Sequence, residues 1–286
     1  MLYKSTIQLL RFPFSYFLMP VFWFALSLLP NLNIFRSLLV FVIIHLLVYP
    51  ASNGYNSYMD RDEESIGGIK KPMQPTRQLF YVSVGMDALA VLFGFMVSSL
   101  FAICIFIYIV FSRLYSYRGV RLKKYPFLGY LVVILNQGAL TFFMVYYGCS
   151  RDLTMQVPWQ GMLAATLLIG GFYPITQVYQ HQQDAKDGVT TISMKLGKRG
   201  TFIFTAMIYS LAFSVLFMYF RQMDQLKNLL ILQLFFLPVL YYFFRWFSQV
   251  WKNESVANHT NTMRMNWIAS TCTNGAFITL LILNQL

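Results

Sequence analysis

Long unbroken runs of apolar residues dominate this sequence. A helix that crosses a bilayer needs roughly 20 consecutive, mostly apolar residues, and we place nine such runs. They lie at 13–30, 35–55, 79–98, 100–118, 127–148, 158–179, 201–220, 228–248 and 265–285. The sequence therefore predicts an all-α polytopic membrane protein of about nine transmembrane helices, in a single domain over residues 1–286.

Composition supports the same fold class. The chain is 57% hydrophobic and only 11% charged, whereas soluble domains carry about 25% charged residues. The first run follows Lys4 and Arg11, lacks a small-residue cleavage site and leads straight into the second run, so we do not expect a cleaved signal peptide. Cys104, Cys149 and Cys272 share no C-x-x-C spacing, which predicts neither a disulfide framework nor a cysteine metal cluster.

The basic residues are distributed unevenly between the two sides of the predicted bundle. The net charge is +12, and if the N-terminus is inside, 18 of the 22 Lys and Arg residues lie in inside segments. The other four are Arg36, Arg151, Arg221 and Lys227. By the positive-inside rule we expect a cell (inner, cytoplasmic) membrane protein with a cytosolic N-terminus and an outside C-terminus. Topology and attraction to anionic membrane lipid explain the charge, so we expect no nucleic-acid partner.

Two acidic groups stand out among the ten acidic residues. Four acids at 60–64 follow the second run, and Asp184 and Asp187 follow the sixth. Both groups are predicted on the inside face, four helices apart, which suggests two related halves whose equivalent helices converge on one site.

Within each group the polar residues recur at helical spacing. If the second helix continues, Asn56, Asp60 and Glu64 lie at i, i+4 and i+8 and form a ladder of oxygen ligands. The second ladder is formed by Gln177, Gln180, Asp184 and Asp187. Oxygen ligands without cysteine favour a hard cation such as Mg²⁺, which completes its shell with water and substrate phosphate. The predicted metal ligands are Asn56, Asp60, Glu64, Gln180, Asp184 and Asp187.

At these residues the chain resembles the UbiA superfamily of intramembrane prenyltransferases. The family's first motif runs N-D-x-x-D-x-x-x-D, and here Asn56, Asp60 and Glu64 match it while Ser57 replaces the first Asp. Its second motif runs D-x-x-x-D, where Gln180 replaces the first Asp and Asp184 matches the second. A third stretch, Leu114–Pro126, is similar to the family's Tyr-Ser and Arg-x-Lys loop. The two replacements leave fewer carboxylates, so the number of metal ions stays open.

The resemblance implies an activity and a set of site residues. It implies Mg²⁺-dependent transfer of a prenyl group from a polyprenyl diphosphate to a small acceptor, by default an aromatic quinone precursor. The implied catalytic residues are Asp60, Asp184, Arg61, Arg121 and Tyr115. The candidate substrate-binding residues are Asn56, Lys123, Lys186, Asn136 and His45. Fixed cations would stabilise the charge that develops on the leaving diphosphate.

Two ionisable residues lie inside the predicted spans. His45 precedes Asn56 by eleven residues, about three helical turns, which predicts that the two share a face. It would either take a proton from an aromatic acceptor or hydrogen-bond a neighbouring helix. Asp87 is expected to be satisfied between helices.

Two rival functions remain open. The first is an intramembrane terpene cyclase of the same superfamily, which ionises the diphosphate without a separate acceptor. The second is a cation-coupled transporter, which would place acidic residues at mid-membrane depth, where this chain has only Asp87.

Overall fold

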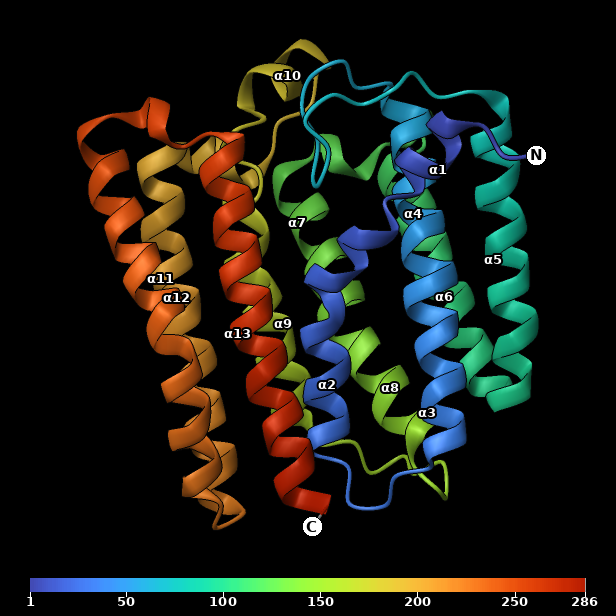
Figure 1. Cartoon of the computed structure of the whole chain (residues 1–286), viewed down its shortest axis with the longest axis vertical. Helices are drawn as coiled ribbons and strands as arrows, with labels where there is room; N and C mark the ends of the chain where they lie inside the picture. Colours follow the sequence, from blue (N-terminus) through green and yellow to red (C-terminus); the bar gives the residue numbers. More distant parts are fainter. Residues whose placement is uncertain (286) are drawn as a thin grey trace.

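Long helices run side by side and almost parallel to one axis of the molecule (Figure 1). The structure is a computed structural model that describes residues 1–285. Eight helical stretches in this range are long and apolar enough to cross a membrane. They are Lys4–Ser27, Ile34–Asp60, Arg77–Val97, Ser99–Ser116, Pro126–Cys149, Ile192–Gln222, Leu226–Lys252 and His259–Gln285. The prediction of an all-α, multi-pass membrane protein is confirmed.

Three of these stretches are built from consecutive helical segments. The first comprises α1 (Lys4–Leu10), the 3₁₀ segment η1 (Phe12–Leu18) and α2 (Met19–Ser27). The second comprises α3 (Ile34–Phe41), the π segment η2 (Val42–Val48) and α4 (Tyr49–Asp60). The fifth comprises α7 (Pro126–Ile134), the π segment η4 (Leu135–Leu140) and α8 (Thr141–Cys149). A π segment widens the turn and rotates everything that follows it.

The remaining elements complete the bundle and its connections. The long helices are α5 (Arg77–Val97), α6 (Ser99–Ser116), α11 (Ile192–Gln222), α12 (Leu226–Lys252) and α13 (His259–Gln285). The short elements are η3 (Leu122–Lys124), α10 (His181–Lys186) and η5 (Glu254–Val256). Only Ser98 separates α5 from α6, and its hydroxyl oxygen accepts a hydrogen bond from the N–H of Phe101. This N-cap begins α6 directly after the turn.

The sixth predicted run forms α9 (Trp159–Ile175), which has only 17 residues. It packs closely against the fifth span. A Cβ added to Gly138 in that span would lie only 2.5 Å from the Cα of Thr166 in α9. It is shorter than the roughly 20 residues that a crossing needs, so the count of nine spans stays a prediction. The two ends of the chain lie at opposite ends of the bundle (Figure 1), as an odd number of crossings requires.

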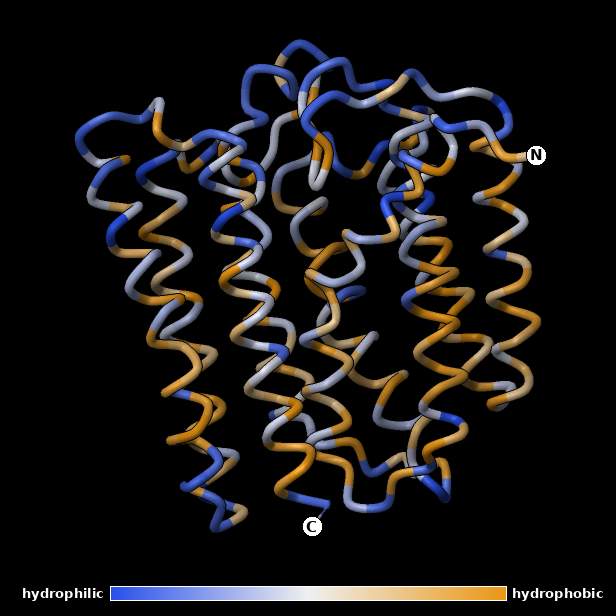
Figure 2. The backbone as a smooth tube through the Cα atoms, in the orientation of Figure 1, coloured by the Kyte–Doolittle hydropathy of each residue, from blue (hydrophilic) through white to orange (hydrophobic). Residues whose placement is uncertain are grey.

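Polar and apolar residues segregate along the bundle axis (Figure 2). The loops at the end that carries α10 are hydrophilic, whereas the middle of the bundle is mostly apolar. Large apolar side chains on the outside of the helices are exposed, among them Leu92, Met96, Phe106 and Tyr241. Such a surface is stable in lipid and would aggregate in water. The protein is therefore a multi-pass membrane protein whose polar residues are concentrated at the ends and in the interior of the helical bundle.

Candidate active site

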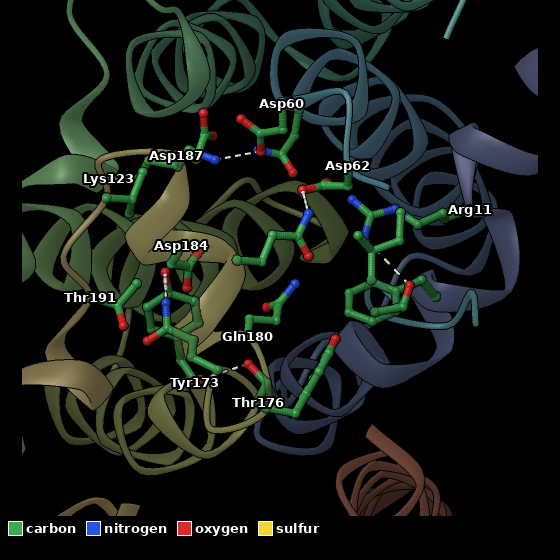
Figure 3. Close-up of a pocket in the computed structure, with 18 of the residues that line it drawn as sticks. Arg11, Asp60, Asp62, Lys123, Tyr173, Thr176, Gln180, Asp184, Asp187 and Thr191 are labelled. Atoms are coloured by element: carbon green, nitrogen blue, oxygen red, sulfur yellow. Dashed lines mark hydrogen bonds and ion pairs between the residues drawn. The ribbon is translucent and has the colours of Figure 1, made fainter. Parts of the chain in front are cut away.

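The two acidic segments meet around one cavity of about 140 Å³ at the end of the bundle that carries α10 (Figure 3). We call it the acidic cavity. Its carboxylates are Asp60, Asp62, Asp184 and Asp187, and its cations are Arg11 and Lys123. Its other polar lining includes Asn56, Tyr115, Tyr173, Gln177, Gln180 and Gln183. The predicted convergence of residues that lie more than 120 positions apart is thus present in the fold.

The helix that carries the first acidic segment ends earlier than the predicted ladder requires. The α4 helix ends at Asp60 because Arg61 adopts a left-handed conformation (φ 55°). Arg118 then donates to the terminal carbonyls of Met59 (2.6 Å) and Asp60 (3.3 Å), which satisfies carbonyls that the helix leaves without partners. The prediction that Asn56, Asp60 and Glu64 form a continuous ladder is wrong at its last position.

Arg61 and Glu64 lie outside the acidic cavity as a result, and so does the predicted Lys186 of α10. Arg61 is exposed and does not line it. Glu64 is also exposed and forms an ion pair with exposed Lys186 at 3.1 Å. An exposed pair of this kind contributes little to stability. The chain instead directs Asp62 into the cavity, where Gln183 donates to its carboxylate at 2.5 Å.

The second acidic segment keeps its residues on one side without being one helix. The α9 helix ends at Ile175, and hydrogen-bonded turns lead to α10. All four members of the predicted second ladder line the cavity: Gln177, Gln180, Asp184 and Asp187. The Oε1 atoms of Gln177 and Gln183 are buried and have no hydrogen-bond partner. Both oxygens are therefore available as acceptors or ligands.

Basic side chains from the loop after α6 hold the two acidic segments together. Arg121 contacts Asp60 at 3.3 Å and makes a close ion pair with Asp187. Lys123 makes a close ion pair with Asp60. The Arg121 and Asp60 side chains are only 10% and 6% exposed, so their charges depend on each other. The predicted Lys123 lines the acidic cavity, whereas the predicted Arg121 lies behind it, on the carboxylates that it joins.

The other two carboxylates of the acidic cavity, Asp184 and Asp62, have raised pKa values. Burial raises the pKa of Asp184 to about 7, and the neighbouring carboxylates of Asp60 and Asp62 add to this. Burial likewise raises the pKa of Asp62 to about 6, with a further contribution from Asp60. Asp184 takes part in no ion pair among residues 1–285, whereas Asp60 and Asp187 do. Asp62 takes part in none of them either, and of these two carboxylates Asp184 has the higher pKa and is the more in need of a cation.

The raised pKa of Asp184 makes stability depend on pH. The folded pKa of about 7 lies above the unfolded value near 3.8, so this group stabilises the fold below about pH 4 and loses that contribution as pH rises to 7. Between pH 4 and pH 7 we expect the free energy of unfolding of the wild type to fall by a few kcal/mol relative to that of Asp184→Asn. Thermal unfolding of both proteins in detergent without divalent metal measures the difference. A difference that is constant from pH 4 to 8 would contradict the expectation.

A chain of hydroxyl groups forms one wall of the acidic cavity. The Tyr115 and Tyr173 hydroxyls are 2.5 Å apart, and the side-chain amide of Gln177 donates to the Tyr173 hydroxyl at 2.9 Å. Tyr115 and Tyr173 come from different helices, α6 and α9, so the pair also joins the two halves of the site. The predicted Tyr115 therefore lines the cavity and is held by a partner.

A second cavity of about 180 Å³ lies next to the first and shares part of its lining. We call it the inner chamber. Both cavities are lined by Arg11, Phe14, Asn56, Tyr115 and Tyr173. The inner chamber adds neutral polar side chains from the spans, namely Ser52, Asn53, Tyr108, Ser112, Asn136 and Gln137. The predicted Asn136 thus belongs to the inner chamber and is buried there.

Comparison with known sequences identifies the family. The pattern of the UbiA prenyltransferase family matches residues 17–268. The chain belongs to this family. No curated protein matches the chain.

Solved UbiA structures share the fold. A UbiA homologue from Archaeoglobus fulgidus, bound to DMAPP and Mg²⁺, is 18% identical with a TM-score of 0.73, and the match covers 98% of this chain and 99% of that one. An apo UbiA homologue from Aeropyrum pernix K1 is 15% identical with a TM-score of 0.68, covering 96% and 99%. A digeranylgeranylglyceryl phosphate synthase structure is 17% identical with a TM-score of 0.62, covering 99% and 98%.

The acidic cavity of this UbiA protein has the donor chemistry that suits Mg²⁺. Within residues 1–285 no three His, Cys, Asp or Glu residues are grouped tightly enough to hold a metal by themselves. Mg²⁺ seldom needs such a cage, because it binds one or two carboxylates and takes its other ligands from water and phosphate. The unpaired Asp184 and the unpartnered amide oxygens of Gln177 and Gln183 supply that set.

His45 does not reach either cavity. Its Nδ1 lies 2.7 Å from the Ser15 hydroxyl, and its ring packs against Phe22, Phe41 and Tyr49. The prediction that it shares a face with Asn56 is wrong because His45 lies within the π segment η2, whose wider turns change the helical register between the two residues. His45 instead forms a hydrogen bond to a neighbouring helical segment, which was the alternative prediction. Asp87 is likewise paired between helices, with Arg113.

Sequence reasoning missed several residues of this UbiA site. Arg11, Asp62 and Gln183 line the acidic cavity but were not among the candidates. Asp62 carried a usable signal, since it belongs to the first acidic group. Arg11 carried none, because it comes from the N-terminal segment, far from both motifs in the sequence.

Proposed function

We propose that this protein transfers the prenyl group of a polyprenyl diphosphate to a small aromatic acceptor, a quinone precursor, in a Mg²⁺-dependent reaction. One observation carries the proposal: two acidic segments line a single cavity that also holds Lys123 and has Arg121 behind it. Carboxylates with cations beside them suit a metal-bound diphosphate, because the carboxylates bind the metal and the cations bind phosphate oxygens. Family membership supports the same reaction class.

The proposed metal ligands are the carboxylates and amides that face the cavity. Asp60, Asp184 and Asp187 would hold Mg²⁺ together with Asn56 and Gln180, and Asp62 joins this set. When bound, Mg²⁺ neutralises the negative charge that develops on the leaving diphosphate. Glu64 pairs with Lys186 outside the cavity lining, so we assign neither of them to the metal or to the diphosphate.

The proposed reaction breaks the allylic C–O bond of the prenyl diphosphate. The electron pair leaves with the diphosphate, a bond forms between the prenyl carbon and the acceptor, and the acceptor loses a proton. Lys123 and Arg121 would stabilise the charge on the departing phosphate, which is larger in the transition state than in the bound substrate. Tyr115 would donate its hydroxyl proton in a hydrogen bond to a diphosphate oxygen.

The prenyl chain needs an apolar path away from the acidic cavity. A small cavity of about 40 Å³ lies among Phe17, Phe24 and Phe172, between α2, α9 and α13. It shares Tyr209 and Phe236 with a larger apolar cavity of about 440 Å³ between α11 and α12. These neighbouring apolar cavities offer surfaces on which a prenyl chain could pack between helices.

We further propose that the acidic cavity opens to the cytosol from the cytoplasmic membrane. The inside segments inferred from charge include the loops that build this cavity, around residues 60–78, 113–124 and 186–199. The positive-inside rule would then set the N-terminus in the cytosol and the C-terminus outside.

The decisive experiment supplies a labelled prenyl diphosphate to membranes that contain the protein. With Mg²⁺ and a panel of hydroxybenzoate, dihydroxynaphthoate and alcohol acceptors, we expect label in a prenylated acceptor. A cyclic hydrocarbon or alcohol formed from geranyl diphosphate alone would favour the cyclase instead. If the prenyl diphosphate stays intact after incubation with every acceptor, both the transferase and the cyclase proposals are contradicted.

A further inference from the structure

The apolar cavity of about 440 Å³ lies between α11 and α12, on the outer side of the bundle. We call it the α11–α12 groove. Two side chains of its α12 wall, Leu237 and Phe244, are each 57% exposed. On the α11 wall the hydroxyls of Thr205 and Ser210 both donate to main-chain carbonyls, which leaves their hydrocarbon parts toward the groove. The groove therefore presents a mostly apolar surface to the outside of the bundle, where the bilayer lies.

The length of the groove corresponds to one leaflet of a bilayer. On α12 its lining runs from Gln233 to Phe244, which is about 16 Å along the axis at about 1.5 Å per residue. The hydrocarbon core of a bilayer is roughly 30 Å thick, so one leaflet contributes roughly 15 Å. The groove volume also falls within the roughly 300–1,000 Å³ of sites that bind small ligands. An extended acyl chain of one leaflet matches these dimensions.

Two arginines stand next to the last lining residues of the groove. Arg245 directly follows Phe244 on α12, and Arg264 directly precedes Met265 on α13. Both arginines are exposed, and the Tyr242 hydroxyl lies close to both of their side chains. Neither takes part in a salt bridge within residues 1–285. Two cations without a carboxylate partner thus mark the place where the groove reaches the membrane surface.

This end of the groove belongs to the end of the bundle that carries α10. The short element η5 connects α12 to α13 there (Figure 1). The only acid in the sequence between residues 225 and 285 is Glu254 in η5, and it pairs with Arg199 at 3.4 Å. The positive charge of the two arginines is therefore not neutralised by the chain around them. We proposed that this end faces the cytosol, and the cytoplasmic leaflet is the one that carries anionic lipid.

We propose that the α11–α12 groove binds an anionic phospholipid, with an acyl chain in the groove and the phosphate on Arg245 and Arg264. A guanidinium suits a phosphate because its planar fork donates two parallel hydrogen bonds. The prenyl diphosphate also combines an anion with a hydrocarbon chain, but the acidic cavity proposed for its head shares no lining residue with the groove. A prenyl chain would meet the groove only with its far end, at Tyr209 and Phe236. The part of the groove beside the arginines is left for a lipid.

Native mass spectrometry of the purified, full-length protein in detergent tests the proposal. The protein is titrated with palmitoyl-oleoyl phosphatidylglycerol, or with phosphatidylcholine that has the same two chains. Wild type should retain one phosphatidylglycerol at lower lipid concentration than phosphatidylcholine. In the double variant Arg245→Gln/Arg264→Gln the apparent Kd for phosphatidylglycerol should rise roughly 30-fold, because each basic side chain near anionic lipid contributes about a factor of five. Its apparent Kd for phosphatidylcholine should change less than about threefold.

Two further variants separate the site from general surface charge. Lys4→Gln/Arg77→Gln removes the same charge from exposed positions at the same end of the bundle, on α1 and α5, away from the groove, and should bind both lipids as wild type does. Ser210→Phe fills the groove from an exposed position without changing charge, and should weaken the binding of both lipids. Thermal unfolding of each variant detects a folding defect.

Three results would overturn the proposal. The first is equal affinity of wild type for the two lipids, or an equal loss of phosphatidylglycerol binding in the two double variants. The second is unchanged lipid binding in Ser210→Phe, which would place the lipid outside the groove. The third is displacement of the bound phosphatidylglycerol by an equal concentration of geranylgeranyl diphosphate, which would assign the groove to the prenyl substrate. None of these measurements depends on turnover, so they are independent of the proposed reaction.

Discussion

Asp184→Ala is expected to lower the turnover of a prenyl diphosphate by at least roughly a thousandfold. Asp184 lines the acidic cavity, is not neutralised by any ion pair within residues 1–285, and has a pKa raised to about 7 by burial. Its removal would delete the carboxylate most available to Mg²⁺. A bound metal contributes several kcal/mol to stabilising developing charge, and each 1.36 kcal/mol corresponds to a factor of ten in rate.

Asp60→Ala should be as damaging, for a different reason. It would remove a proposed ligand and also leave Arg121 and Lys123 without their shared partner. Steady-state transfer of label in nanodiscs measures both losses. Asp152→Ala is the matched control, because Asp152 is exposed in another loop and lines neither cavity. Activities within tenfold of wild type for both Asp60→Ala and Asp184→Ala would remove the proposed metal site.

Chelation of divalent metal with EDTA should abolish turnover, and excess Mg²⁺ should restore it. The oxygen-only donor set of the acidic cavity predicts a hard cation. Without metal, four carboxylates would face an incoming diphosphate, and like charges repel strongly at low dielectric. We expect the residual rate to fall below roughly a thousandth of the Mg²⁺ rate.

Add-back experiments show which ion the site prefers. Mg²⁺ and Mn²⁺ should restore turnover better than Ca²⁺, which is larger and prefers more protein oxygens. Binding of labelled geranyl diphosphate should weaken in parallel with the rate. Full activity after exhaustive chelation would rule out a metal-dependent mechanism for this protein.

Much of the architecture followed from hydrophobicity alone. Runs of about twenty apolar residues leave the chain few alternatives to transmembrane helices, and eight of the predicted runs correspond to such helices. The convergence of the two acidic segments was also predictable, because Asp60 and Asp184 recur at equivalent positions of two halves. Both line one cavity.

The errors have local causes that helical spacing does not reveal. Glu64 was assigned to a ladder that assumes a continuous helix, but the left-handed conformation of Arg61 ends α4 at Asp60. His45 was aligned with Asn56 by counting ideal turns, and the π segment η2 changes that count. Arg11 reaches the site only through tertiary packing of the N-terminal segment. Periodicity carries no information about such contacts.

The guanidinium of Arg121 has a consequence for how the protein is made. It joins Asp60, from the first half of the chain, to Asp187, from the second. During synthesis Asp60 and Arg121 leave the ribosome well before Asp187, so the cavity cannot close until more than 180 residues have been inserted into the membrane. Contacts of such long sequence separation form late. A chain truncated after its fifth span would hold only the first of the two acidic segments that line the cavity.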